Sequence, residues 1–376
     1  MDPTTASTFR RDYFSAQQDV QAGVVPSRAR AANSHWDIWT QFCSELGLHS
    51  SLQECQDPVP YLQVFARRYR EGSIAPRKKR VRSRTVEDAL RSVGQTFASV
   101  GSSDPRLTTQ GNIDFRLQRQ LACYSKQDPP PDRVKPVPIQ ILKHLHAVAS
   151  VSLLASNLAI ADMMIIAFFY LLRPGEYTGS PTDTTPFKLQ DVQLSIGHTR
   201  LDLLTASDDD LLAASFATLT FTTQKNGVRG EVVGLGTTGS PTFCPVRCLG
   251  RRVVHLRAHN APLHTPLATY FENQTWKPVK PSHITSALKL SATLLGPTFG
   301  FLAKDVSARS LRAAGAMALL CANVDHDTIR LIGRWRSDEM LRYLHIQAEP
   351  VMRDMAKKMF HHGAFVLHPG QDVPMF

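Results

Sequence analysis

Four side chains near the end of the sequence have types and spacings that suit chemistry on a phosphate group. Arg309 and Arg312 are three residues apart, Trp335 follows, and Tyr343 comes eight residues after Trp335. A phenol is a weak nucleophile at neutral pH because its pKa is about 10, so an enzyme that uses one needs fixed positive charge beside it. The stretch 307–345 therefore predicts a site where two arginines hold a phosphate close to the hydroxyl of Tyr343.

Short helices are expected to position these side chains. A helix over 310–321 is favoured by the run AAGAMALL, and on it the two arginines would project from one face. Asp325 or Asp327 can cap a second helix, which Gly333 ends. Ser337 can then cap a last short helix, from which the tyrosine could reach back to the arginines.

The residues of this stretch resemble the C-terminal signature of the tyrosine recombinase (phage integrase) family, most closely its eukaryotic transposon branches of the Crypton and DIRS kind. That signature reads His-x-x-Arg, then a His or Trp, then the nucleophilic Tyr. The segments RSLRAAGAMALL, GRW and YLH match it through Arg312, Trp335 and Tyr343. Further upstream, LLRPGE resembles the family's first arginine motif, with Arg173 as the arginine and Glu176 placed to orient it.

The resemblance implies a site-specific DNA breaking and rejoining enzyme that uses no cofactor and no metal ion. Tyr343 would form a 3'-phosphotyrosyl link with the DNA. The family carries its catalytic Lys on a β-hairpin, and Lys225 lies at the tip of the hairpin expected over 217–235, where it would protonate the departing 5' oxygen. Double-stranded DNA and a homo-tetramer on it are the implied partners. The side chains that would hold the phosphate are Arg173, Arg309, Arg312 and Trp335.

Arg309 departs from the family pattern, which has His at this position. A His can donate a hydrogen bond and exchange a proton, whereas an Arg only donates because it stays charged. One alternative is therefore a degenerate or domesticated relative that binds duplex DNA without cutting it. Another alignment makes Arg309 the catalytic Arg and places Val306 at the His position, although the spacing to Trp335 and Tyr343 favours Arg312. A type IB topoisomerase shares the chemistry, but the N-terminal helical part resembles recombinases more.

Composition indicates a globular protein with a polyanionic partner. The 376 residues are 43% apolar, and the formal net charge of +11 is shared by both halves; nucleic acid is the simplest such partner. The N-terminus lacks an apolar signal-peptide core, and the run 161–172 contains Asp162 and is too short to span a bilayer, so we expect an intracellular protein without a membrane partner. Cys244 and Cys248 have no second ligand pair, so we expect no zinc site.

The sharpest basic cluster is RKKRVRSR, directly after Pro76. It could contact DNA phosphates, act as a nuclear-import signal, or be a solvated loop. In a eukaryotic cell it would predict a nuclear protein. The side chains that we expect to bind DNA are Arg77, Lys78, Lys79, Arg80, Arg82 and Arg84.

Hydrophobic periodicity predicts a mainly α-helical fold with a small antiparallel sheet in the C-terminal half. Thr85 with Asp88 resembles a capping box at the start of one amphipathic helix. The apolar stripe of that helix, which we expect to be buried, is Val86, Leu90, Val93 and Phe97. A buried helix over 158–172 should end at Arg173, since Pro174 disfavours its continuation. Short extended runs, interrupted by an acidic loop at 207–210, predict strands at 187–194, 199–204, 217–223 and 231–235. From residue 244 onward the sequence predicts helices again.

Five segments are expected along the chain. The proline-rich stretch cannot be helix or central strand, so it predicts a stiff linker between two domains. The family divides in the same way, into a SAM-like core-binding domain and an α+β catalytic domain that close on duplex DNA. The expected segments are a frayed N-terminus (1–25), a helical core-binding domain (26–125), a linker (126–137), a catalytic domain (138–360) and a C-terminal tail (361–376).

Overall fold

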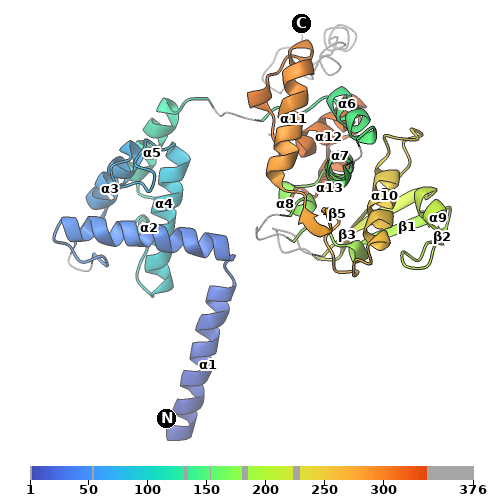
Figure 1. Ribbon diagram of the computed structural model, residues 1–376. Helices are drawn as coiled ribbons and strands as arrows, with labels where there is room; N and C mark the ends of the chain where they lie inside the picture. Colours follow the sequence, from blue (N-terminus) through green and yellow to red (C-terminus); the bar gives the residue numbers. More distant parts are fainter. Residues whose placement is uncertain are drawn as a thin grey trace, which may run out of the picture. The chain divides into compact units, whose positions relative to one another are not determined.

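The computed structural model divides the chain into two compact units, Met1–Asp132 and Arg133–Phe376 (Figure 1). The residues that the structure describes are 2–52, 55–130, 134–152, 154–179, 185–222 and 229–336. Within this part of the chain, no helix combines the length and the apolar composition needed to cross a membrane.

The first unit is helical. Four helices share one core, because each has an apolar face with helical periodicity; Trp39, Phe65, Leu90 and Phe97 are among its most buried side chains. The helices of this unit are α1 (Pro3–Ala22), α2 (Pro26–Glu45), α3 (Val59–Glu71), α4 (Ser83–Ser99) and α5 (Phe115–Gln127).

Two expectations for the first unit are wrong. The N-terminus is helical as α1 rather than frayed, and its large side chains, such as Phe9 and Tyr13, are exposed. Helix α4 begins at Ser83, two residues before the expected cap, and its N-cap residue Arg82 makes no side-chain capping bond. Asp88 instead accepts a hydrogen bond from Arg91 at 3.1 Å, on the outside of the helix.

The second unit is built around α7, whose side chains are buried nearly all round. Helices α6, α10, α11 and α12 pack against α7, as Figure 1 shows, and α13 packs on α12. The helices of this unit are α6 (Ile139–Ser150), α7 (Ala155–Phe169), α8 (Pro174–Tyr177), α9 (Asp208–Leu212), α10 (Pro245–Ala258), α11 (Pro281–Leu295), α12 (Ser310–Cys321) and α13 (His326–Ile332). In the described part of this unit, 3-10 turns lie at Leu189–Asp191, Gly296–Phe299 and Ala303–Asp305.

A small antiparallel sheet in the order β2-β1-β3-β4 packs against α10 in the second unit. Its central strand β3 alternates, with Ala217, Leu219 and Phe221 buried in the core, and β4 pairs with it from Phe216↔Gly236 to Phe221↔Glu231. The mainly α-helical class with a small antiparallel sheet is confirmed. The strands are β1 (Val192–Ile196), β2 (Thr199–Arg200), β3 (Phe216–Phe221) and β4 (Glu231–Gly236).

Two further elements differ from expectation. The acidic stretch 207–210 opens α9 instead of forming a loop, because the Ser207 hydroxyl caps the helix by accepting from the Asp210 backbone N–H at 3.0 Å. The chain after α10 was expected to be helical, but it first forms a two-stranded hairpin, β5 (Thr269–Glu272) and β6 (Thr275–Pro278).

Candidate functional site

The candidate site lies where the buried helix α7 ends. The helix stops at Phe169, earlier than expected, because Leu171 adopts a left-handed φ of 50° that turns the backbone away before Pro174 can act. Arg173 is consequently not the last helical residue; it is the N-cap of α8, in which Pro174 takes the favourable first position. The carbonyls of Tyr170 and Leu171 instead accept hydrogen bonds from arginine side chains, at the end of a helix where positive charge is favoured.

Arg312 reaches this helix end from α12. Its Nη1 donates to the Leu171 carbonyl at 2.6 Å and its Nη2 donates to the Gly333 carbonyl. The guanidinium carbon lies 4.1 Å from the centroid of the Trp335 ring, so cation and indole are stacked. Arg312 is only 3% exposed. Two stretches distant in sequence, each carrying a predicted site residue, therefore meet at one point.

A close approach of α12 to α7 makes this contact available. A Cβ added at Gly315 would lie 2.1 Å from the carbonyl oxygen of Phe168 and 2.3 Å from the Leu171 side chain. Only glycine leaves room for the two helices at this distance, which places Arg312, one turn earlier on α12, beside the end of α7.

Arg173 is held by Glu176. Its backbone N–H donates to Oε2 and its Nη1 donates to Oε1, both at 2.8 Å. The Glu176 carboxylate is buried, whereas the Arg173 side chain is 28% exposed. The guanidinium of Arg173 thus has one side fixed by a carboxylate and another side open to solvent, which is the arrangement needed to bind an anion.

Arg334 completes the group, and sequence reasoning did not find it. Its Nη2 lies 3.2 Å from Glu176 Oε2 and 3.3 Å from the Leu171 carbonyl. Burial lowers the pKa of this arginine to about 10, while the charge of Glu176 acts in the opposite direction. The motif GRW contains it, but nothing in the spacing marks a cation there as buried. We call Arg173, Arg312, Arg334 and Glu176 the arginine cluster.

The other predicted site residues have different surroundings. Arg309 is the N-cap residue of α12 and is exposed, so it does not share the buried environment of Arg312 although the two are three residues apart. Lys225 and Tyr343 lie outside the described residues.

Two tyrosines close to the cluster are unsuited to nucleophilic attack. The hydroxyl of Tyr177 donates to the Ala308 carbonyl at 2.8 Å, and that of Tyr170 donates to the Ala217 carbonyl at 2.8 Å. Both side chains are fully buried, and burial raises the pKa of each phenol above its ordinary value. Their role is to fasten α8 and α7 to neighbouring segments.

In the first unit, the basic loop (77–84) lies in the connection that follows α3 and extends into the first turn of α4. Its six basic side chains are all exposed. The loop leaves α3 at Gly72, whose φ is 92° and where a Cβ would lie 2.4 Å from the Lys79 backbone, so this turn requires glycine. Lys78 also takes a positive φ of 49°, and its Nζ donates to the Ser73 carbonyl at 3.0 Å.

A buried ion pair anchors the basic loop. Arg70, 3% exposed, pairs with Asp128 and donates to the Val81 carbonyl, while Ser83 donates to Asp128 from its backbone at 2.8 Å. Burial alone would raise the pKa of the Asp128 carboxyl, but the hydrogen bonds from Ser83 and Arg70 outweigh it and lower the pKa to about 2. Asp128 lies in the expected linker, yet these bonds make it part of the first unit.

No protein-family model and no curated protein matches the chain. Similar solved structures are recombinases and integrases. The Tn1549 transposon integrase with transposon right end DNA is 14% identical over 81% of this chain and 85% of that one, with a TM-score of 0.46. XerA recombinase is 15% identical over 89% and 100% (TM-score 0.38), and XerH site-specific recombinase bound to difH is 12% identical over 80% and 69% (TM-score 0.43).

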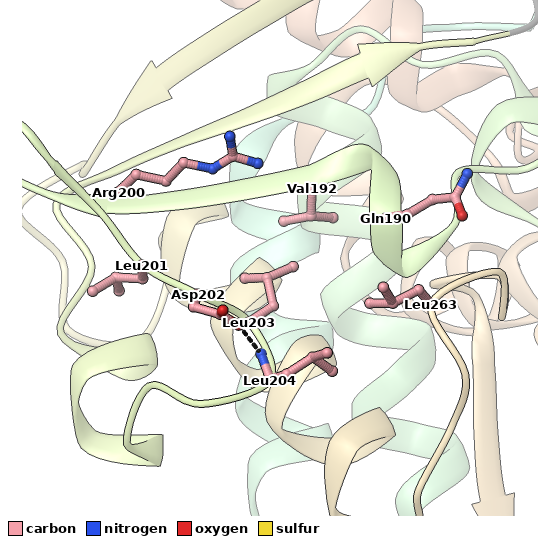
Figure 2. A pocket seen from close by; sticks show the side chains of 8 residues that line it. All are labelled: Gln190, Val192, Arg200, Leu201, Asp202, Leu203, Leu204 and Leu263. Carbon is pink, nitrogen blue, oxygen red and sulfur yellow. Dashed lines mark hydrogen bonds between the residues drawn. The ribbon is translucent and has the colours of Figure 1, made fainter.

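A pocket of about 460 Å³ opens on the second unit beside β1 and β2. Figure 2 shows its aliphatic side chains, among them Leu201, Leu203 and Leu263, with Arg200 nearby. It shares no residue with the arginine cluster.

Among the described residues, no three His, Cys, Asp or Glu side chains are grouped so as to hold a metal ion. Cys244 and Cys248 are buried packing residues, and burial raises the pKa of the Cys248 thiol.

Proposed function

We propose that the chain is a DNA breaking and rejoining enzyme of the tyrosine recombinase type. The phenol of Tyr343 releases its proton to solvent, its oxygen attacks a backbone phosphate, the bond between phosphorus and the 5' oxygen breaks, and a 3'-phosphotyrosyl link forms. Lys225 gives a proton to the departing 5' oxygen, since an ammonium can release one at moderate cost. Charge on the phosphate is balanced by guanidinium groups, a role that metal ions fill in other phosphoryl-transfer sites.

The observation that carries this proposal is the meeting of the two predicted arginine motifs at the end of α7. Arg312 contacts the carbonyl of Leu171, 141 residues away in sequence, and Leu171 is two residues from Arg173. The resemblance predicts that Arg173, Arg312 and Trp335 share one phosphate, and the contacts of Arg312 with the Leu171 carbonyl and the Trp335 ring support that prediction. A site for a phosphate diester needs such a convergence of cations on rigid elements.

Arg312 is buried and firmly oriented, which affects how it would contribute to phosphate binding. Its two carbonyl bonds fix the plane of the guanidinium, and the Trp335 ring fixes its tilt. A guanidinium has five N–H donors, so two carbonyl bonds do not by themselves exhaust it. We propose that Arg173, the more exposed of the pair, meets the phosphate first, and that Arg312 contributes a fixed charge behind it.

The partners follow from the same proposal. Double-stranded DNA is the substrate. The first unit binds it through the basic loop, and the second unit binds it through Arg173 and Arg312. A homo-tetramer on two duplexes is the assembly that strand exchange requires. In a eukaryotic cell the basic loop would also direct the protein to the nucleus. Whether the chain belongs to a Crypton-like or DIRS-like element stays a prediction.

A second candidate function is DNA binding without cleavage. Arg309 favours it, because the exposed position at the start of α12 carries no group that can exchange a proton at neutral pH. On this alternative Arg173 and Arg312 would still bind a phosphate, and DNA affinity would be retained.

A nicked duplex distinguishes the two functions. Duplexes drawn from the DNA that flanks the coding sequence, each with a nick beside the candidate cleavage point, lose the short 5'-hydroxyl fragment and so trap the covalent intermediate. The proposed enzyme gives a protein–DNA adduct that resists denaturation. Tyr343→Phe keeps the ring but removes the nucleophilic oxygen, so it should bind DNA within a few-fold of the parent and form no adduct. DNA binding by the parent without any adduct would favour the second function.

A further inference from the structure

Arg334 is a buried cation that the proposed chemistry does not use. Its side chain is 1% exposed, and the guanidinium lies over the Phe221 ring, 3.8 Å from the centroid. Burying a charge costs several kcal/mol unless partners compensate, so such a residue is kept only in a well-defined arrangement. The acceptors of its Nη groups are the carbonyls of Tyr170 (3.2 Å), Leu171 (3.3 Å) and Ile332 (3.0 Å) and the Glu176 carboxylate (3.2 Å).

Glu176 connects Arg334 to Arg173. Its Oε2 accepts from Arg334 Nη2 and from the Arg173 backbone N–H, while its Oε1 accepts from Arg173 Nη1. The carboxylate is thereby held from two sides, and its orientation decides where the Arg173 guanidinium points. With Arg334 removed, a buried carboxylate would keep only the partially exposed Arg173 as a cationic partner, and either its rotamer or its protonation would change.

Arg334 also joins two segments with unusual backbone conformations. Leu171 and Arg334 both have left-handed φ angles, of 50° and 57°, which cost energy for residues that carry a Cβ. The bond from Arg334 Nη2 to the Leu171 carbonyl links the two, and Phe221 adds the end of β3. One side chain therefore connects the segment before Arg173, the end of α13 at Ile332 and the end of β3.

We infer that Arg334 is a positioning residue: by fixing Glu176 and the Leu171 carbonyl, it holds the guanidinium of Arg173 in the orientation that binds a phosphate diester, without touching DNA itself. This inference rests on the proposed function for its role in cleavage. The orientation of Arg173 can nevertheless be measured without any cleavage, which keeps the two ideas separable.

Reactivity of Arg173 is the direct test. p-Hydroxyphenylglyoxal modifies accessible guanidinium groups, and peptide mapping reports the rate at each arginine of the intact chain. In Arg334→Gln, Glu176 loses its second partner, so modification of Arg173 should speed up by about tenfold, the scale of one charged hydrogen bond. With a nicked duplex, formation of the adduct from bound DNA should slow by about a hundredfold, roughly 2.7 kcal/mol of barrier.

Arg252 offers a matched control in the same unit. It is 2% exposed and donates Nε to the Leu267 carbonyl at 3.1 Å and Nη2 to the Thr269 carbonyl, but it contacts no member of the arginine cluster. Arg252→Gln removes an equally buried arginine and should lower thermal stability without changing either readout at a temperature where it is folded. Equal effects of Arg252→Gln and Arg334→Gln on Arg173 would reduce Arg334 to a general stabiliser and overturn the inference.

A second variant covers the case in which Arg334→Gln does not fold. Glu176→Gln keeps the size of the side chain but removes its charge, and it should raise the modification rate of Arg173 in the same way. Unchanged reactivity in Glu176→Gln would contradict the proposed connection. If the parent forms no adduct on any duplex while Arg173 still responds to both substitutions, the positioning role holds and the proposed cleavage activity fails.

Discussion

The guanidinium of Arg312 is stacked on the indole of Trp335, with 4.1 Å between the guanidinium carbon and the ring centroid. Trp335 in turn packs near Ala316 and Ile329, so the ring is held by α12, which carries the arginine, and by α13. A buried cation in contact with an aromatic face gains up to about 2 kcal/mol. The stack therefore helps to hold the fixed charge on which the proposed chemistry depends.

Replacing Trp335 by Leu should slow adduct formation from bound DNA by about tenfold, or roughly 1.4 kcal/mol. Leucine keeps apolar packing but has no π face, so Arg312 would lose its lateral support. Single-turnover kinetics on a nicked duplex measure the change. Trp276→Leu, on the partly exposed β6 strand, is the control and should react at the parent rate. A Trp335→Leu variant with the parent rate would show that stacking does not position the charge.

Gly315→Ala should lower the free energy of unfolding by about 1–3 kcal/mol, the usual range for overpacking. The added methyl would lie 2.1 Å from the Phe168 carbonyl oxygen, so α12 has to move away from α7 and carry Arg312 with it. Urea denaturation measures the loss. In Gly236→Ala the methyl meets only the Ser215 carbonyl at 3.9 Å, and stability should stay within about 1 kcal/mol of the parent.

Local patterns in the sequence predicted the helices that bury an amphipathic stripe. In α4, Val86, Leu90, Val93 and Phe97 recur at helical spacing, and all four are buried as expected. Hydrophobic periodicity is a local property, so it can be found without knowledge of the fold. The β5–β6 hairpin was not predicted, because strands of four residues are too short for an alternating apolar pattern to be distinct.

Tertiary features set the rest of the candidate site. The end of α7 depends on the left-handed backbone conformation of Leu171, which a leucine at this position gives no reason to predict. The role of Arg334 depends on Glu176, 158 residues earlier in the chain, and on burial that its flanking sequence does not indicate. The ion pair between Arg70 and Asp128 likewise joins the helical domain to a residue that the proline content assigned to the linker. Long-range contacts of this kind leave no periodic signal.

Replacing Arg77, Lys78 and Lys79 together by Ala should weaken DNA binding and flatten its salt dependence. Each lost phosphate contact reduces the slope of log K against log salt by roughly 0.9. Fluorescence anisotropy at several salt concentrations measures both quantities. As a control, Arg91 and Arg116 have partly exposed side chains that are already paired with carboxylates, and their replacement should leave the slope nearly unchanged.

The outcome also decides between the roles of the basic loop. If the triple variant keeps the parent affinity and slope but no longer accumulates in the nucleus, the loop is an import signal rather than a DNA contact. A drop of about a thousandfold in the rate of adduct formation from bound DNA, about 4 kcal/mol, would instead place the loop in the chemical step and contradict our proposal.

Folding stability should fall as the pH is lowered from about 6.5 toward 4, in part through His255. Burial, with the nearby charges of Arg252 and His259, lowers the pKa of His255 to about 4, and its Nε2 accepts a hydrogen bond from the Phe271 backbone at 3.0 Å. Between these pH values the unfolded chain binds the extra proton, so acid favours unfolding. His255→Gln can still accept that bond but cannot titrate there, and its unfolding free energy should depend less on pH. If urea titrations gave the parent and His255→Gln the same dependence of unfolding free energy on pH, His255 would not be a source of the acid sensitivity.

Arg309→His tests whether the exposed residue at the start of α12 limits the chemistry. A histidine could exchange a proton as well as donate a hydrogen bond; if Arg309 is a serviceable donor, adduct formation should change by no more than about tenfold, roughly 1.4 kcal/mol, in either direction. An adduct that appears only in Arg309→His, and disappears again when Tyr343→Phe is added, would identify the parent as a DNA-binding protein disabled at one residue. An adduct that survives Tyr343→Phe would mean that another side chain is the nucleophile.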